Sequence, residues 1–230
     1  MQKKTISLFL LCTLLITSCG IVSTTPTADQ MDKSPFTGIP CAAPCWYGLE
    51  IGKSNESDVI SKIQALTFID RNSVYIHHMS SMSTYDDPRV FGEGVEVRAN
   101  CINTGNQCVT VQVVNNILTE ISTLLNYQIK VDKAIKYLGN PNYVGFDRAG
   151  GEQIACRVYL IWSEKQLILA SKIFEGLNAS EKNCYVIREV GKLSPNLLVS
   201  EVRYVSTATI KELQASSASE FFEFTGTLSQ

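Results

Sequence analysis

Histidine, tryptophan and long hydrophobic runs are all scarce in this sequence. Of its 230 residues, two are histidine and two are tryptophan, and its most prominent apolar segment covers only residues 6–16. A helix that crosses a bilayer needs about twenty apolar residues, so this segment is too short to be one.

Charged residues are also few, and the two signs nearly cancel. Charged side chains make up 18% of the chain, and the formal net charge is −2. Nucleic-acid-binding proteins carry a basic surplus on one face, so this balance argues against a nucleic-acid partner. The apolar fraction of 45% is enough to form a buried core. The length suits one large domain or two small ones.

The motifs that mark many catalytic and metal sites are missing. The two histidines, His77 and His78, are adjacent. Adjacent side chains on a strand point to opposite faces, which suits a metal poorly, so we expect both in a solvent-facing loop. Residues 80–83 lack the Gly-x-Ser-x-Gly elbow of serine hydrolases, and residues 145–151 are expected to form a loop without a phosphate-binding fingerprint. The sequence predicts no catalytic residue, no metal site and no cofactor.

The N-terminus has the pattern of a secreted lipoprotein. Lys3 and Lys4 precede the apolar segment, as in a signal peptide. The segment is followed by Ile-Thr-Ser-Cys, ending at Cys19, which resembles the bacterial lipobox. In that motif small side chains fit the peptidase, and only a thiol forms the thioether to diacylglycerol. We expect a lipoprotein signal peptide over residues 1–18 and lipidation, including palmitate, at Cys19. An ordinary signal peptide with an incidental cysteine is the alternative.

Lipidation at Cys19 predicts a protein of the bacterial cell envelope, held by its acyl chains on the extracytoplasmic side of a membrane. Residues 19–40 are rich in Ser, Thr and Pro without an apolar period, which predicts a flexible tether. Loss of residues 1–18 removes two lysines and no acidic residue, so the remainder has a net charge of −4.

Six of the eight cysteines remain once Cys12 leaves with the signal peptide and Cys19 is lipidated. An even number in an oxidising compartment is typical of disulfides, and fifteen pairings of six cysteines are possible. A zinc or redox site is the alternative, but no C-x-x-C spacing and no nearby histidine favours it. Proximity in the sequence favours the pairs Cys41–Cys45, Cys101–Cys108 and Cys156–Cys184.

The rest of the chain alternates between helix and strand patterns. An N-cap at Ser54 or Asn55 precedes apolar residues at helical spacing over residues 59–66. A second helix covers residues 131–138 and ends at Gly139. Alternating apolar and polar residues, with Asn-Asn as a hairpin turn, indicate antiparallel strands after each helix. These strands cover residues 95–99, 109–113 and 117–121, then 157–162, 166–170 and 198–205, before a last helix at 207–217.

This order predicts an α+β fold of two tandem units, each a helix packed on a three- to four-stranded antiparallel sheet and stapled by disulfides. The first unit covers residues 41–127 and the second residues 128–230. The sequence does not decide whether the two units share one core. We expect Phe221, Phe222 and Phe224 in a terminal strand or helix that packs on the core, with an exposed patch for a partner as the alternative.

Two motifs resemble a known family. Residues 46–54, Trp-Tyr-Gly-Leu-Glu-Ile-Gly-Lys-Ser, with Val59 are similar to the G-I-x-x-G-x-[ST]-x-x-x-V opening of small bacterial envelope lipoproteins. Residues 134–141, Ala-Ile-Lys-Tyr-Leu-Gly-Asn-Pro, are similar to the V-x-x-x-L-G-x-P of the same proteins. The family includes the small lipoprotein of the outer-membrane barrel-assembly machinery and, by fold, the β-lactamase inhibitor protein. The resemblance implies helices on a three-stranded antiparallel sheet, sometimes in tandem. Residues 40–46, Pro-Cys-Ala-Ala-Pro-Cys-Trp, are also similar to uncharacterised bacterial lipoproteins.

These observations predict a lipid-anchored extracytoplasmic binding or scaffold protein, not an enzyme, whose partner is a protein or polymer of the envelope. One alternative is a proteinaceous inhibitor of a secreted enzyme, with residues 71–94 as the exposed loop that enters an active site. The other is an envelope hydrolase whose site carries no recognisable motif. A fold does not carry an activity, so the resemblance does not choose among the three.

Overall fold

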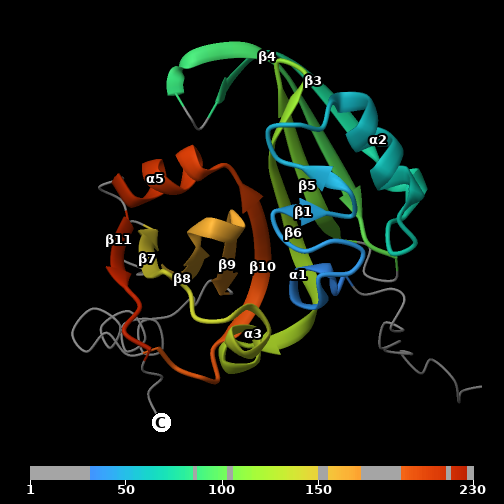
Figure 1. The fold of residues 1–230 in the computed structure, drawn as a ribbon. Coiled ribbons are helices and arrows are strands. Elements are labelled where there is room, and N and C mark those ends of the chain that lie inside the picture. Colours follow the sequence, from blue (N-terminus) through green and yellow to red (C-terminus); the bar gives the residue numbers. More distant parts are fainter. Residues whose placement is uncertain are drawn as a thin grey trace, which may run out of the picture.

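The dominant feature of the molecule is a single antiparallel sheet (Figure 1). The computed structural model describes residues 32–84, 87–102, 106–149, 155–171, 193–215 and 219–226. Within these ranges nine strands form the sheet in the order β11-β7-β8-β9-β10-β6-β5-β4-β3. The fold is therefore α+β, mostly antiparallel sheet with few helices.

The nine strands are β3 (Tyr75–Thr84), β4 (Asp87–Asn100), β5 (Gln107–Val114), β6 (Ile117–Lys130), β7 (Tyr143–Ala149), β8 (Ala155–Trp162), β9 (Leu167–Ser171), β10 (Leu198–Val205) and β11 (Ser219–Glu223). A separate two-stranded hairpin is formed by β1 (Cys45–Trp46) and β2 (Leu49–Glu50). The helices are α1 (Ser34–Thr37), α2 (Glu56–Ala65), α3 (Val131–Leu138) and α5 (Thr207–Ala215), and the 3₁₀ turns are η2 (Arg71–Ser73) and η3 (Ser163–Lys165).

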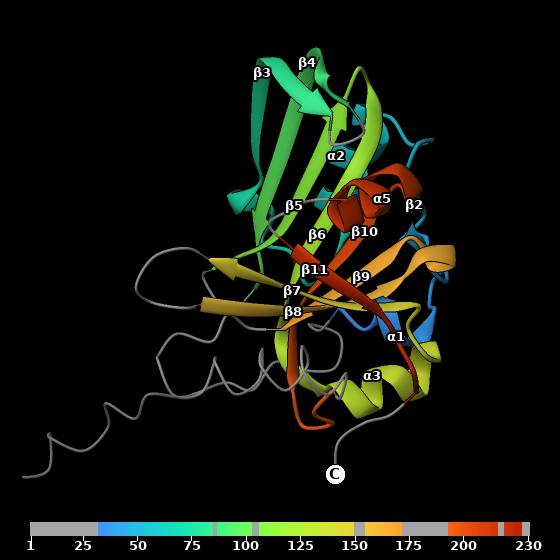
Figure 2. The same ribbon diagram turned by 90° about the vertical axis from the view of Figure 1, so that its left-hand side faces the viewer.

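The sheet consists of two four-stranded meanders joined edge to edge, with β11 added as an edge strand beside β7. Strands β3 to β6 follow one another in the chain and in the sheet, and so do β7 to β10. The meanders meet where β6 pairs with β10, for example Ser122 opposite Arg203. In Figure 2 the strands of the second meander run steeply across those of the first, because each strand pair adds to the right-handed twist of the sheet.

Local sequence explains the first meander. Valines alternate with polar residues in β4 and β5, so one face is buried and the other meets solvent. The β5–β6 turn is Asn115-Asn116, and both residues have positive φ, 51° and 60°. Asparagine tolerates this conformation, which a two-residue hairpin of this kind requires.

The three longer helices lie on different parts of the sheet. Asn55 caps α2 with a capping box, in which its side chain accepts from the Asp58 N–H and the Asp58 side chain accepts from the Asn55 N–H. Helix α2 contacts β4 and β6, and α3 contacts β6 and α1. Helix α5 packs Ile210 against β8, β9 and β10 as part of a separate apolar cluster.

One continuous apolar core runs along both meanders. It joins Val59 and Ile63 of α2 to residues as far away as Leu169 of β9 and Val202 of β10. The sequence left the question of one or two cores open, and the structure has one main core. The two tandem units expected from the sequence instead share a single sheet, and their boundary at residues 127–128 falls inside β6.

Two stretches expected as loops are strands. The described residues of 71–94, the candidate exposed loop of the inhibitor alternative, form η2, β3 and the first part of β4, and both histidines lie on β3. Residues 145–149, expected in a glycine-rich loop, belong to β7. In both cases neighbouring strands supply hydrogen bonds that the weak local pattern does not reveal.

Residues that were expected in the tether are part of the fold. The tether was expected to reach residue 40, but Asp32, Ser34 and Phe36 are buried. The Phe36 ring lies 6.5 Å from the Tyr127 ring and 6.3 Å from the Tyr137 ring. None of the described helices is long and apolar enough to cross a bilayer.

Candidate functional site

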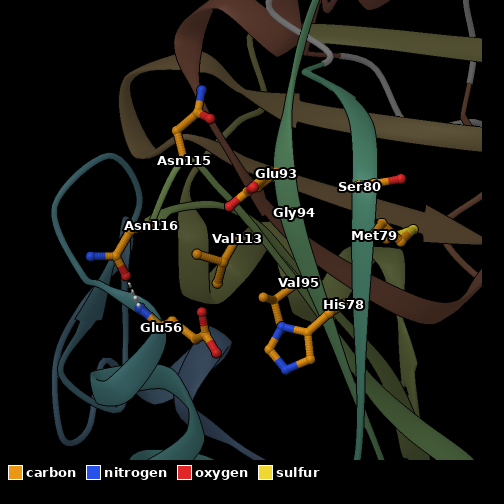
Figure 3. Close-up of a pocket in the computed structure, with 10 residues that line it drawn as sticks. All are labelled: Glu56, His78, Met79, Ser80, Glu93, Gly94, Val95, Val113, Asn115 and Asn116. Atoms are coloured by element: carbon orange, nitrogen blue, oxygen red, sulfur yellow. Dashed lines mark hydrogen bonds between the residues drawn. The ribbon is translucent and has the colours of Figure 1, made fainter.

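A pocket lies beside the β5–β6 turn (Figure 3). Figure 1 shows that this end of the first meander is remote from α1 and α3. Its volume is about 680 Å³, within the usual range of small-ligand sites. Figure 3 shows the carboxylates of Glu56 and Glu93 and the imidazole of His78 placed around Val95 and Val113. The valines are buried and form an apolar floor.

Two hydrogen bonds from the β5–β6 turn fix the geometry of this pocket. The Asn116 side-chain oxygen accepts from the Glu56 N–H at 3.2 Å, which ties the β5–β6 turn to the first turn of α2. The Asn115 N–H donates to the Glu93 carbonyl at 2.9 Å, which ties the same turn to β4. The turn therefore positions both carboxylate-bearing residues.

The polar groups of the pocket suit a ligand with cationic or hydroxyl groups. Within the described ranges no ion pair neutralises Glu56 or Glu93. The pocket is open, because Glu93 and His78 are exposed and Glu56 is half-buried. These side chains remain solvated, unlike the desolvated groups of many catalytic sites.

The second candidate surface is the sheet face opposite α2. Residues of neighbouring strands stand in two rows across this face. The rows are Tyr75, Arg98, Thr110, Ser122 and Arg203, and His77, Glu96, Gln112 and Glu120. We call these nine residues the open face. The Tyr75 and His77 rings stack at 6.1 Å between centroids, and Tyr75 is 56% exposed.

A buried glutamate organises the charges beside the open face. Glu201, on β10, forms ion pairs with Arg157 and Arg203. Its Oε1 also accepts from the Ser122 hydroxyl at 2.7 Å across the β6–β10 junction. The Arg157 guanidinium lies 5.8 Å from the centre of the Tyr159 ring. Two guanidinium groups are therefore held in fixed positions where the two meanders meet.

Glu120 lies next to this network on β6. Burial raises the pKa of its carboxyl, and the nearby Arg203 guanidinium partly offsets that effect. Arg203 thus contacts Glu201 directly and also acts on Glu120 through its charge, which links the two rows of the open face.

A second buried carboxylate fixes the start of the fold. Asp32 accepts from the Trp46 indole N–H at 2.8 Å and from the Ser34 hydroxyl at 2.7 Å. The Tyr127 hydroxyl donates to the Asp32 carbonyl at 2.5 Å. Burial raises the pKa of the Asp32 carboxyl, although the hydrogen bonds from Trp46 and Ser34 act in the opposite direction. Burial followed by the Asp32 charge raises the pKa of Tyr127 and Tyr204 as well.

The structure contains two disulfides, Cys41–Cys45 and Cys101–Cys108. They are two of the pairs that proximity favours. The first closes the segment before β1, and the second joins the residues that flank the turn between β4 and β5. Cys19 and Cys184 lie outside the described residues, so the lipidation site and the expected Cys156–Cys184 pair stay predictions.

The two histidines face opposite sides of β3 instead of standing in a loop. His77 stacks on Tyr75, and His78 lines the pocket. Within the described ranges no three histidine, cysteine, aspartate or glutamate side chains gather to hold a metal ion. Phe221 and Phe222 lie on β11, the edge strand beside β7, where Phe221 packs on the apolar cluster under α5.

Sequence reasoning did not single out Glu201, Arg157, Asp32 or Glu93. Glu201 and Arg203 stand two residues apart on a strand with an apolar alternate face, a weak sign that both point the same way. Asp32 lies in a Ser- and Pro-containing stretch whose composition indicates a tether.

The fold and these surfaces define a protein with a polar, partly exposed sheet face and an open pocket. Comparisons of the chain with known protein families, curated proteins and solved structures give no match.

Proposed function

We propose that this chain is a lipid-anchored extracytoplasmic binding or scaffold protein, which presents its open face to a protein or polymer of the bacterial envelope. The observation that carries the proposal is the open face itself. It combines fixed charges with the exposed Tyr75 ring on a rigid sheet. Aromatic and arginine side chains are the residues that contribute most at protein interfaces.

The anchoring part of the proposal is supported by the signal-peptide and lipobox patterns at residues 1–19. Disulfides fit an oxidising compartment. The two consecutive helix-plus-meander segments, α2 with β3–β6 and α3 with β7–β10, support the idea that the chain contains two related tandem units, as in the lipoprotein family that it resembles.

Copurification from native membranes tests the proposal. The lipidated chain is crosslinked in membranes and compared with Arg98→Glu on the open face and with Lys211→Glu on α5, an exposed control with the same change in charge. We expect one envelope component to be retained by the wild type and by Lys211→Glu. Charge reversal at Arg98 should weaken its recovery about tenfold or more. Equal recovery with all three chains would contradict a role for the open face.

One observation favours a hydrolase as a second candidate function. Glu56 and Glu93 line the same pocket, and paired carboxylates can act as general acid and base. Turnover of purified envelope polymers by the wild type, and its loss in Glu93→Gln, would support this candidate. The inhibitor alternative stays a prediction, with the described residues of 71–94 in η2, β3 and the first part of β4.

A further inference from the structure

Four exposed lysines gather at the end of the molecule where the described chain begins. Lys33 lies just before α1, Lys130 precedes α3, and Lys133 and Lys136 lie on α3. Helices α1 and α3 contact each other, and Figures 1 and 2 place both at the end remote from the β3–β4 hairpin. We call these four lysines, with Ile39 and Tyr137, the basic end.

The basic end carries a local positive charge on a chain that is acidic as a whole. In the part of the chain that the structure describes, no ion pair joins any of its lysines to a carboxylate. Lys130 donates to the Asn196 amide oxygen at 2.8 Å, which leaves its charge in place. On α3 the only carboxylate is Asp132, whose oxygen accepts from the Lys133 N–H.

Apolar side chains are exposed among these lysines. Ile39 is 72% exposed and Tyr137 is 60% exposed, the two largest exposed fractions among the exposed large hydrophobic side chains. Lysine around an exposed tyrosine and an aliphatic side chain is typical of surfaces that lie in the headgroup region of a bilayer, where the tyrosine ring and the lysine stems contact lipid.

The position of Asp32 limits how far this end can lie from the anchor. Thirteen residue steps separate Cys19 from Asp32 in the sequence. At about 3.3–3.6 Å per residue, they span no more than about 47 Å. Hydrogen bonds to Trp46 and Tyr127 hold Asp32 in the fold, so the end that carries Lys33 is the part of the described molecule tied to the membrane.

We infer that the basic end lies on an anionic phospholipid surface, which directs the pocket away from the membrane. This inference rests on the proposed lipid anchor at Cys19. Each lysine near an anionic surface strengthens binding by a factor of about five. A lipid anchor combined with such a basic patch gives the protein a fixed orientation on the membrane, which the length of the segment between Cys19 and Asp32 alone does not impose.

The two tryptophans are natural probes of this orientation. The Trp46 indole donates to Asp32, next to Lys33, and the Trp162 indole donates to the carbonyl of Gly139, at the end of α3. Energy transfer from these tryptophans to a dansyl-labelled phospholipid reports how closely the basic end approaches the bilayer.

The experiment uses the full lipidated chain in vesicles of phosphatidylcholine alone, or with about a quarter of phosphatidylglycerol. We expect transfer to rise about twofold with the anionic lipid and to fall back between about 0.05 and 0.5 M salt, because salt screens exposed charges. Equal transfer in the two compositions, or transfer insensitive to salt, would overturn the inference.

A matched pair of triple variants tests the lysines themselves. Lys130→Gln, Lys133→Gln and Lys136→Gln together should remove the gain from phosphatidylglycerol. Lys53→Gln, Lys62→Gln and Lys211→Gln together remove the same charge elsewhere and should keep the gain. An equal loss in both variants would overturn the inference, and near-ultraviolet circular dichroism verifies that both are folded. Sedimentation of the protein with the vesicles is measured separately. Loss of this sedimentation would contradict the lipid anchor at Cys19, and not the contact of the basic end with the lipid surface.

Discussion

At the scale of single residues, two buried carboxylates hold distant parts of the chain together. Asp32 ties the start of the fold to Trp46, and Glu201 ties Arg157 and Arg203 to the junction of the two meanders. Burial of a charge is unfavourable unless hydrogen bonds or ion pairs compensate it. Each carboxylate therefore makes a specific and testable contribution to stability.

Replacement of Glu201 should destabilise the protein strongly. Glu201→Ala leaves Arg157 and Arg203 without their shared carboxylate in a mostly buried site, and removal of one partner of a buried ion pair costs about 3–5 kcal/mol. Lys53→Ala breaks the exposed pair with Glu50 and should change the free energy of unfolding by less than about 1 kcal/mol. Urea unfolding followed by tryptophan fluorescence measures both, and similar losses in the two variants would refute the role given to Glu201.

Asp32 should make stability depend on pH in a defined direction. Its pKa is raised in the folded state above the ordinary value of 3.8, so the folded protein binds this proton more readily than the unfolded chain. The stabilisation is then greatest below pH 3.8 and is lost as pH rises through the raised pKa. Compared with Asp32→Asn, the wild type should lose relative stability by about 1.4 kcal/mol per pH unit between the two pKa values.

Unfolding of the wild type and of Asp32→Asn at a series of pH values measures this difference, and the subtraction cancels groups such as Glu120 that titrate in both. A difference that is constant, or that grows as pH rises, would show that burial does not dominate at Asp32.

At the scale of elements, β11 depends on a glycine in its neighbour. Gly145 of β7 stands opposite Phe221 of β11, and the Phe221 ring covers it. A Cβ at residue 145 would lie 2.1 Å from Cδ1 of that ring, so the ring would have to move. The position of β11, and its contact with the cluster under α5, therefore depend on the absence of a side chain at residue 145.

A double-mutant cycle tests that coupling. Gly145→Ala alone should cost about 1–3 kcal/mol, because it overpacks against Phe221. In a Phe221→Ala background the same change should be neutral or stabilising, since alanine is favoured over glycine in a strand once the clash is gone. Additive effects of the two substitutions would mean that Phe221 does not pack on Gly145 in solution.

The elements themselves were predictable where a local pattern was strong. Asn55 with Val59 and Ile63 marks α2, and the alternating valines mark β4 and β5. Strand β3 was not predictable, because Tyr75–Thr84 has no clear alternation and pairs only through β4. The pocket was missed for the same reason, since Glu56, Glu93 and His78 meet only after β3, β4 and α2 are assembled.

At the scale of the whole molecule, the sequence predicts the class but not the assembly. Helices followed by antiparallel strands were expected, and the α+β class is confirmed. The edge-to-edge junction of β6 with β10 was not expected, because nothing in the local sequence specifies which strand edges pair. That junction creates the single sheet, brings Glu201 to Ser122, and gives the open face its extent.

The two ends of the molecule carry charges of opposite sign. The basic end lies beside Asp32, where the described chain begins, and the pocket with Glu56 and Glu93 lies at the other end of the first meander. An anchored molecule of this kind would hold its open face and pocket clear of the lipid surface, in reach of an envelope partner.

Site-specific photo-crosslinking in native membranes tests the central claim most directly. A photoreactive amino acid replaces Thr110, near the middle of the open face, or Gln64, an exposed position on α2 that serves as the control. If the open face binds a partner, irradiation should give a discrete crosslinked species from position 110 and none from position 64. Crosslinking from position 64 alone, or from neither position with the lipidated chain intact, would contradict the account.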